Sequence, residues 1–142
     1  MNHTYLDNLA KISIDIKNAS LKSGDNIKLV LVSKTQKKDS IEKIYKLGYK
    51  CFGENYLQEA KDKIQSLKSY DIEWHFIGRI QSNKIKDIVK LFDWIHTVSS
   101  EKHIEMIDRF AGQFKKIINI CVQINIDEEE SKAGLKLSQI DN

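Results

Sequence analysis

Short runs of apolar, mostly β-branched residues alternate with longer amphipathic stretches along most of this chain. Five apolar runs predict β-strands: residues 28–33, 50–53, 73–78, 93–99 and 117–126. Their nearly continuous apolar composition is typical of parallel strands that are covered on both faces. The stretches between them repeat apolar residues every three or four positions, which predicts helices. The alternation therefore predicts an α/β fold with a parallel sheet.

The ends of the expected helices carry recognisable signals. A further helix is predicted before Lys28, where leucine and isoleucine recur at helical spacing. Polar residues at helix starts predict caps, namely Asp39 with Glu42, Ser82, and either Ser99 or Ser100. Gly48 stands where a C-terminal cap is expected.

Length and composition narrow the class of protein. The chain has 142 residues, which suits one domain, and 41% hydrophobic with 30% charged residues suits a core with a solvated surface. The formal net charge is +3 with the basic residues scattered, so nucleic-acid binding is permitted but not indicated. The apolar runs are too short to cross a bilayer, and the start lacks the order of a signal peptide. We therefore expect a soluble cytoplasmic protein.

Polar residues follow each predicted strand, and in parallel α/β folds the chemistry gathers at these carboxyl ends. Lys34 comes directly after the run LVLVS. Partial burial at a strand end favours the neutral amine, which is the nucleophile toward carbonyls. The alternative is a lysine whose stem lies along the surface while its amine reaches solvent. Position alone leaves both open.

Other strand-end residues also have two interpretations. Gly53 and Gly78 either let a ligand approach the backbone or allow tight turns. Asn55 and Ser82 either contact a ligand or cap helices. Glycine-rich phosphate-binding loops are absent from the sequence, which removes the usual equipment for nucleotide chemistry.

Spacing along the chain does not indicate a metal site. Cys51 and Cys121 each lie in an apolar stretch, so we expect two buried thiols and neither a disulfide nor a zinc site. His75 lies inside a predicted strand, where a hydrogen-bonded core histidine is expected. His96 and His103 show no ligand spacing.

Four motifs follow one another along the chain: LVLVSKT (29–35), FGENYLQEA (52–60), WHFIGRIQSNK (74–84) and VQINIDEEESKAGL (122–135). HTVSS (96–100) supports them. In this order they resemble the pyridoxal phosphate (PLP) homeostasis proteins, also called YggS or PROSC-like proteins. The resemblance covers essentially the whole chain.

The resemblance implies a (β/α)₈ TIM-type barrel like the N-terminal domain of alanine racemase. Such a barrel needs eight strands and at least about 200 residues, whereas this sequence stops at Asn142 after the fifth predicted strand. We therefore expect an incomplete α/β barrel with about five of eight strands, preceded by an N-terminal helix. Residues 1–142 would form a single PLP-binding domain that lacks the C-terminal βα units.

The resemblance also implies the roles of four residues. Lys34 matches the lysine that holds PLP as a Schiff base, Asn55 and Tyr56 match residues beside the cofactor, and Lys132 matches a lysine near the pocket mouth. The implied protein is a carrier or regulator in vitamin B6 balance without catalytic residues or a metal. Its partners would be PLP and PLP-dependent apo-enzymes. Gln36 and Lys37 stand where relatives often have Lys-Pro, which changes the loop beside the cofactor.

Two other functions stay open. The chain could be a fragment of a fold-related PLP-dependent racemase or decarboxylase, although the missing second domain and the motif HFIGRIQSNK count against it. It could also be a basic nucleic-acid-binding module that uses its scattered lysines.

Overall fold

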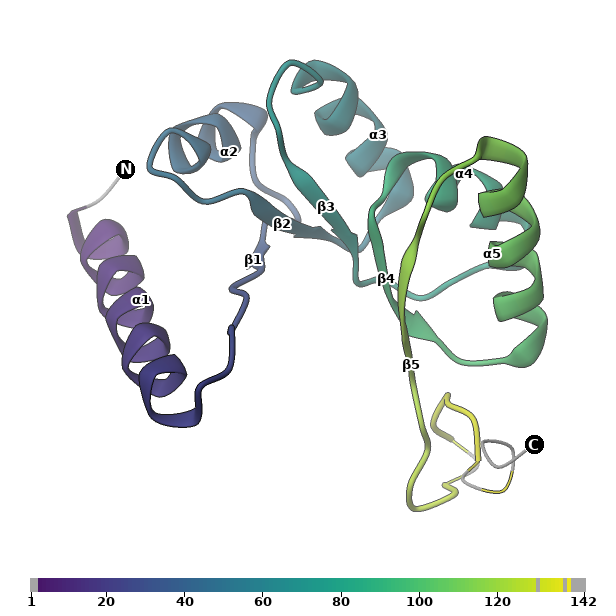
Figure 1. Cartoon of the computed structure of the whole chain (residues 1–142). Coiled ribbons are helices and arrows are strands. Elements are labelled where there is room, and N and C mark those ends of the chain that lie inside the picture. Colours follow the sequence, from purple (N-terminus) through teal and green to yellow (C-terminus); the bar gives the residue numbers. More distant parts are fainter. Residues whose placement is uncertain (1–2, 130, 137, 139–142) are drawn as a thin grey trace. The chain divides into compact units, whose positions relative to one another are not determined.

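The computed structural model describes residues 3–129, 131–136 and 138, and the chain divides into two compact units, residues 1–30 and 31–142. The first unit contains helix α1 (His3–Ser23), drawn in purple in Figure 1. This confirms the helix predicted before Lys28.

The second unit is built on a parallel sheet (Figure 1). Its strands are β1 (Leu31–Val32), β2 (Cys51–Glu54), β3 (Glu73–Phe76), β4 (Trp94–Val98) and β5 (Asn119–Val122). They lie in the order β1-β2-β3-β4-β5, and every neighbouring pair is parallel. Each predicted apolar run coincides with one strand, and β2 extends one residue past its run. The α/β expectation is therefore confirmed, although the strands are shorter than most of the runs.

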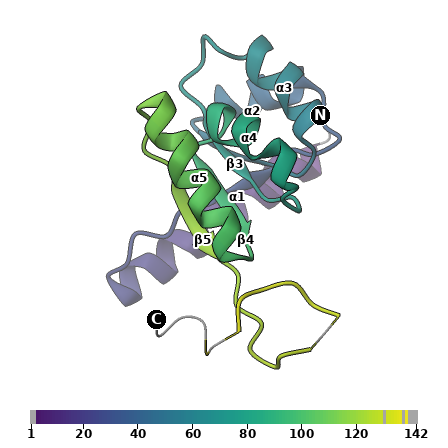
Figure 2. The same ribbon diagram turned by 90° about the vertical axis from the view of Figure 1, so that its right-hand side faces the viewer.

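Helices connect the strands and gather on one side of the sheet (Figure 1). They are α2 (Lys38–Tyr45), α3 (Leu57–Ser66), α4 (Ile85–Leu91) and α5 (Glu101–Phe114), with a 3₁₀ helix η1 (Ser82–Lys84) before α4. Helices α4 and α5 pack against each other, as Figure 2 also shows. A strand order that follows the chain, with helices on one face, is the arrangement of part of a β/α barrel.

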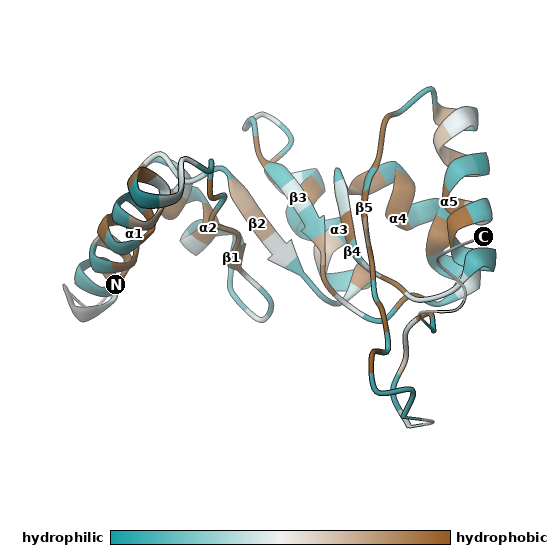
Figure 3. Cartoon of the chain, turned by 60° about the horizontal axis from the view of Figure 1, so that its bottom comes forward, coloured by the Kyte–Doolittle hydropathy of each residue, from teal (hydrophilic) through white to brown (hydrophobic). Residues whose placement is uncertain are grey.

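The core lies between the sheet and these helices. Successive side chains of a strand point to opposite faces, so Trp74 and Phe76 share one face of β3. Phe76 packs edge-on against Phe92 at the end of α4, with ring centroids 5.2 Å apart. Helix α4 buries Ile85, Ile88 and Val89, and α5 also has an apolar and a polar side (Figure 3).

The cysteines do not lie in this core. Cys51 and Cys121 are both half-buried thiols outside any disulfide, so the expectation of buried thiols was wrong. The reason is the strand register: Cys51 pairs with Glu73, on the face of the sheet opposite Phe76. The helices gather on one side of the sheet (Figure 1), and the register places the cysteines on the other face.

The predicted caps were partly right. Ser100 accepts a hydrogen bond from the His103 backbone N–H at the start of α5, and Gly48 has a φ of +98° just after α2. Asp39 was wrong as a cap, because α2 begins at Lys38 and places Asp39 inside the first turn. Its carboxylate can still interact with the positive end of the helix dipole there.

Ser82 was also wrong as a helix cap. It is the first residue of η1, whose N-cap is Gln81. The Ser82 hydroxyl instead lies 3.3 Å from His103 Nε2. The contact joins the turn after β3 to helix α5.

The turn after β3 crosses closely over the turn after β2. A Cβ atom added to Gly78 would lie 2.0 Å from the Asn55 carbonyl oxygen. The Thr97 hydroxyl donates a hydrogen bond to the Gly78 carbonyl from the neighbouring strand. Gly78 therefore serves close packing of two backbone segments, a role that differs from both interpretations of this glycine in the sequence analysis.

Within the residues that the structure describes, no helix has the length and apolar character needed to cross a membrane.

We expect Gly78→Ala to lower the free energy of unfolding by about 1–3 kcal/mol, because the added methyl group overpacks against main chain. Gly112→Ala is the matched control: a Cβ there meets no described atom within 4 Å, and the residue lies inside α5. Alanine should stabilise that helix by about 0.5–1 kcal/mol. Urea denaturation measures both changes. Equal effects of the two substitutions would contradict the close approach at Gly78.

Candidate functional site

The carboxyl ends of β1 and β2 bring Lys34 and Asn55 to neighbouring positions. Val32 pairs with Gly53, and the Ser33 N–H donates to the Gly53 carbonyl at 2.9 Å. Lys34 directly follows Ser33, and Asn55 lies two residues after Gly53. The Lys34 side chain is exposed, and its Nζ makes no hydrogen bond or ion pair with any described residue.

Of the two interpretations that the sequence left open for Lys34, the exposed side chain fits the surface lysine and not the partly buried one. The reason is that β1 is an edge strand of the described sheet and only two residues long. No other strand of this sheet lies beyond β1 to shield Lys34 from water. What the fold provides at Lys34 is a free amine at a strand end.

Asn55 presents a buried acceptor at the same place. Its Oδ1 is buried and has no hydrogen-bond partner among the described residues. Helix α3 has Tyr56 as its N-cap, so the capping interpretation of Asn55 was wrong. Buried polar atoms are nearly always hydrogen-bonded in folded proteins. An unpaired carbonyl oxygen at the strand ends is therefore suited to a ligand that donates a hydrogen bond.

Tyr56 follows Asn55 and is 61% exposed. Its ring stands at the start of α3, on the same turn as Asn55. Lys34, Asn55 and Tyr56 thus gather at the ends of the first two strands.

Lys132 lies elsewhere in the described structure. It belongs to the segment that follows β5, the opposite edge strand from β1. Its Nζ forms an ion pair with Glu129 at 2.7 Å, and Asn125 holds the loop by donating to the carbonyls of both residues. In the described parts of the chain, no hydrogen bond or ion pair joins Lys132 to Lys34, Asn55 or Tyr56.

A buried ionic cluster lies beneath the Lys34 turn. Lys63 on α3 donates to Glu54 Oε1 at 2.8 Å and to Glu59 Oε1 at 2.6 Å. The same amine donates to the Ser33 carbonyl at 2.8 Å, and the Ser33 hydroxyl donates to Glu54 at 2.6 Å. The Glu54 and Lys63 side chains are only 0% and 8% exposed. The cluster joins β1, β2 and α3 directly behind Lys34.

The cluster also holds an unusual backbone conformation. Thr35 has a φ of +63°, which is rare for a β-branched residue. Its N–H donates to Glu59 Oε1 at 2.7 Å, and the Gln36 N–H closes the turn onto the Ser33 carbonyl at 3.0 Å. Strained residues of this kind persist where the surroundings fix them, and they concentrate at functional sites.

Glu59 is charged in this arrangement. The hydrogen bond from Lys63 lowers the pKa of Glu59 from its ordinary value of 4.5, and the Thr35 N–H acts in the same direction. A charged Glu59 accepts stronger hydrogen bonds than a neutral one. The Thr35 turn is therefore fixed at neutral pH.

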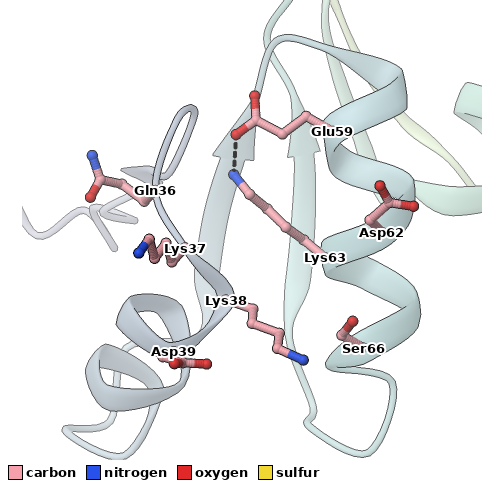
Figure 4. Close-up of a pocket in the computed structure, with 8 residues that line it drawn as sticks. All are labelled: Gln36, Lys37, Lys38, Asp39, Glu59, Asp62, Lys63 and Ser66. Carbon is pink, nitrogen blue, oxygen red and sulfur yellow. Dashed lines mark hydrogen bonds and ion pairs between the residues drawn. The ribbon is translucent and has the colours of Figure 1, made fainter.

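A hollow of about 420 Å³ lies beside the turn, between the start of α2 and helix α3 (Figure 4). It is lined by Gln36, Lys37, Lys38, Asp39, Glu59, Asp62, Lys63 and Ser66. Lys34, Asn55 and Tyr56 do not line it. The hollow is open, and its lining mixes cations with carboxylates, so we place the candidate site at the strand ends.

The sequence analysis did not identify Lys63, Glu54 or Glu59 as site residues. Glu54 and Glu59 belong to the motif FGENYLQEA, but a glutamate within a strand and two charges four residues apart on a helix are also common on protein surfaces. The signal that could have found them is Glu54 itself, a carboxylate placed at the end of an apolar strand. Such a group requires a cation nearby when it is buried.

Comparison with known proteins places the chain in a family. The family model described as alanine racemase, N-terminal domain, matches residues 8–142. The pyridoxal phosphate homeostasis protein of Pasteurella multocida (strain Pm70) is 38% identical over 142 residues, which cover 96% of this chain and 61% of that protein.

Solved structures agree. PipY of Synechococcus elongatus PCC7942 without PLP matches with a TM-score of 0.72 and 39% identity, over 82% of this chain and 55% of PipY. The PLP-bound form of PipY matches with a TM-score of 0.69 and 37% identity over the same shares. These matches confirm the resemblance to the PLP homeostasis proteins. The chain spans about 61% of the length of the first curated relative.

We expect Lys63→Met to lower the free energy of unfolding by about 3–5 kcal/mol, because it leaves the Glu54 carboxylate buried without its cation. Lys61→Met is the matched control on the same helix, since Lys61 pairs with Asp87 in a partly exposed ion pair. Its loss should cost at most about 1 kcal/mol. Urea denaturation followed by tryptophan fluorescence compares the two, and equal losses would contradict a buried cluster.

Proposed function

The chain belongs to the alanine racemase N-terminal domain family, and we propose that it binds pyridoxal 5′-phosphate and takes part in PLP (vitamin B6) homeostasis. The observation that carries the proposal is that Lys34, with a free amine, and Asn55, with an unpaired buried oxygen, follow the ends of two neighbouring strands. The printed names of the relatives support it: one is a pyridoxal phosphate homeostasis protein, and PipY has a structure with PLP bound.

The two groups fit the chemistry of this cofactor. We propose that Lys34 Nζ adds to the PLP aldehyde and that water leaves, so that a Schiff base joins the two. The reaction needs an unpaired amine, and the exposed Lys34 has no competing carboxylate among the described residues. PLP carries a hydroxyl and a ring nitrogen that can donate hydrogen bonds, and Asn55 Oδ1 can accept one.

The buried cluster gives Lys34 a fixed position. Lys63 holds the Ser33 carbonyl and Glu59 holds the Thr35 N–H, so both neighbours of Lys34 are anchored. An anchored turn reduces the conformational entropy that a bound ligand must otherwise remove. We propose that this anchoring distinguishes Lys34 from the other exposed lysines.

The remaining assignments from the resemblance belong to the same proposal. Tyr56 would lie beside the cofactor, and Lys132 would act near the pocket mouth in the complete protein. Residues 1–142 would form one PLP-binding domain of a cytoplasmic protein that carries PLP without catalytic turnover and delivers it to apo-enzymes. A racemase or decarboxylase fragment and a nucleic-acid-binding module have no specific observation in their favour.

We expect borohydride treatment of the chain mixed with PLP to trap the cofactor covalently on Lys34. Lys34→Ala should lose the specific adduct and its absorbance band. Lys37→Ala is the matched control, because Lys37 is exposed in the same loop only three residues away. Peptide mapping by mass spectrometry locates the adduct. An adduct mainly on Lys37, or a band unchanged in Lys34→Ala, would show that the assignment is wrong.

We expect Asn55→Ala to weaken PLP binding by about two- to tenfold, the value of one hydrogen bond. The same substitution should leave the free energy of unfolding unchanged or raise it, because it removes a buried oxygen that has no partner among the described residues. Titration followed by absorbance and urea denaturation measure the two effects. Lower stability with unchanged PLP affinity would mean that Asn55 has a structural role instead.

A further inference from the structure

The sheet face opposite the core carries a row of polar side chains that spans four strands. In the sheet register Cys51 on β2 pairs with Glu73 on β3, and His75 lies two residues further along the same face. His96 on β4 and Cys121 on β5 continue the row. These residues come from four separate strands, so sequence spacing gave no sign of the group.

Close contacts connect the row from end to end. His75 Nε2 lies 2.8 Å from Glu73 Oε1, and Cys51 Sγ lies 3.4 Å from the same oxygen. His75 Nδ1 lies 2.9 Å from His96 Nε2, and His96 Nδ1 lies 3.9 Å from Cys121 Sγ. His75 is 1% exposed, and both of its ring nitrogens have hydrogen-bond partners. This is the hydrogen-bonded core histidine that the sequence analysis expected.

Three members of the row also bring three possible metal-ligand atoms close together, which hydrogen bonding in a core does not require. A thiol sulfur, a carboxylate oxygen and an imidazole nitrogen, from Cys51, Glu73 and His75, all lie within 4.8 Å of one another. Gly53 pairs with His75 across the strands and contributes no side chain to the same face. Cys51 and Glu73 are half-buried, so solvent reaches the group.

We propose that Cys51, Glu73 and His75 form a binding site for a divalent transition-metal ion, with Zn²⁺ as the best match. Sulfur, nitrogen and carboxylate oxygen are the donors that zinc uses in proteins, and three protein ligands leave a fourth position for water. Ligand atoms around tetrahedral zinc lie about 3.3–3.6 Å apart. The Cys51–Glu73 distance of 3.4 Å already fits, and the Glu73–His75 pair must widen by a small side-chain rotation.

The protons balance without another reactant. The Cys51 thiol loses one proton to solvent and binds as the thiolate. His75 binds through Nε2, so its proton must sit on Nδ1, where His96 Nε2 accepts the hydrogen bond. His96 then carries its own proton on Nδ1, facing Cys121. His96 thus accepts the hydrogen bond that fixes the orientation of the His75 ring, as partners of metal-bound histidines do in known sites.

The test uses Co²⁺ as a spectroscopic probe on the untagged 142-residue chain, in a non-chelating buffer with a phosphine reductant. The expected result is saturation at one ion per chain, with a thiolate-to-cobalt charge-transfer band that Zn²⁺ abolishes by displacing the cobalt. Cys51→Ser should remove the band and weaken Zn²⁺ binding at least about tenfold. His96→Gln should weaken binding about 10- to 100-fold while keeping the band.

Cys121→Ser is the matched control, since Cys121 lies in the same row but outside the proposed ligands. It should keep the band and the affinity. Binding without saturation, a band that persists in Cys51→Ser, or a band lost in Cys121→Ser would each overturn the proposal. Far-UV circular dichroism verifies that every variant is folded. If Cys51→Ser does not fold, Glu73→Gln tests the proposal instead, and it should weaken Zn²⁺ binding. PLP binding does not enter this test.

Discussion

The buried ion pair between Glu54 and Lys63 determines the geometry of the strand ends. Removing a carboxylate from water costs several kcal/mol unless a cation and hydrogen bonds replace the water. Glu54 is fully buried, so helix α3 must lie where Lys63 reaches it. The same amine binds the Ser33 carbonyl, and this contact positions β1. A strand of two residues forms few backbone hydrogen bonds with its neighbour. Side-chain hydrogen bonds from Lys63 and Ser33 therefore help to hold β1 in place.

The alternation of side chains along the strands separates three kinds of chemistry. One face of the sheet is apolar and packs against the helices, with Phe76 on Phe92 as an example. The opposite face carries the polar row through His75 and His96. The strand ends carry Lys34 and Asn55. A shift of one residue in register would exchange the two faces, so the register of β2 with β3 fixes the core and the polar row together.

The sequence predicted the order of strands and helices because hydrophobic periodicity reports which face of an element is buried. It failed at features that depend on another segment. Asp39 and Ser82 were predicted to cap helices. Helix α2 begins before Asp39, and the Ser82 hydroxyl contacts His103 instead. Lys63 carried no signal, because a helical lysine near a glutamate is usual on a surface. Only the fold brings it to Glu54.

Lys34 shows most clearly what the fold adds to the residue itself. The sequence left a partly buried and a surface lysine both open, and the structure leaves the side chain exposed. Exposure alone does not distinguish it, since Lys37 is exposed three residues away. The difference lies in the backbone: Ser33 and Thr35 are both held by the Lys63–Glu59–Glu54 cluster, and Thr35 keeps a left-handed conformation there. Such a conformation costs about 1–3 kcal/mol, and a charged, anchored acceptor at Glu59 offsets part of it. The position of the Lys34 backbone therefore depends on a helix residue 29 positions along the chain, through the same buried charges that stabilise the fold.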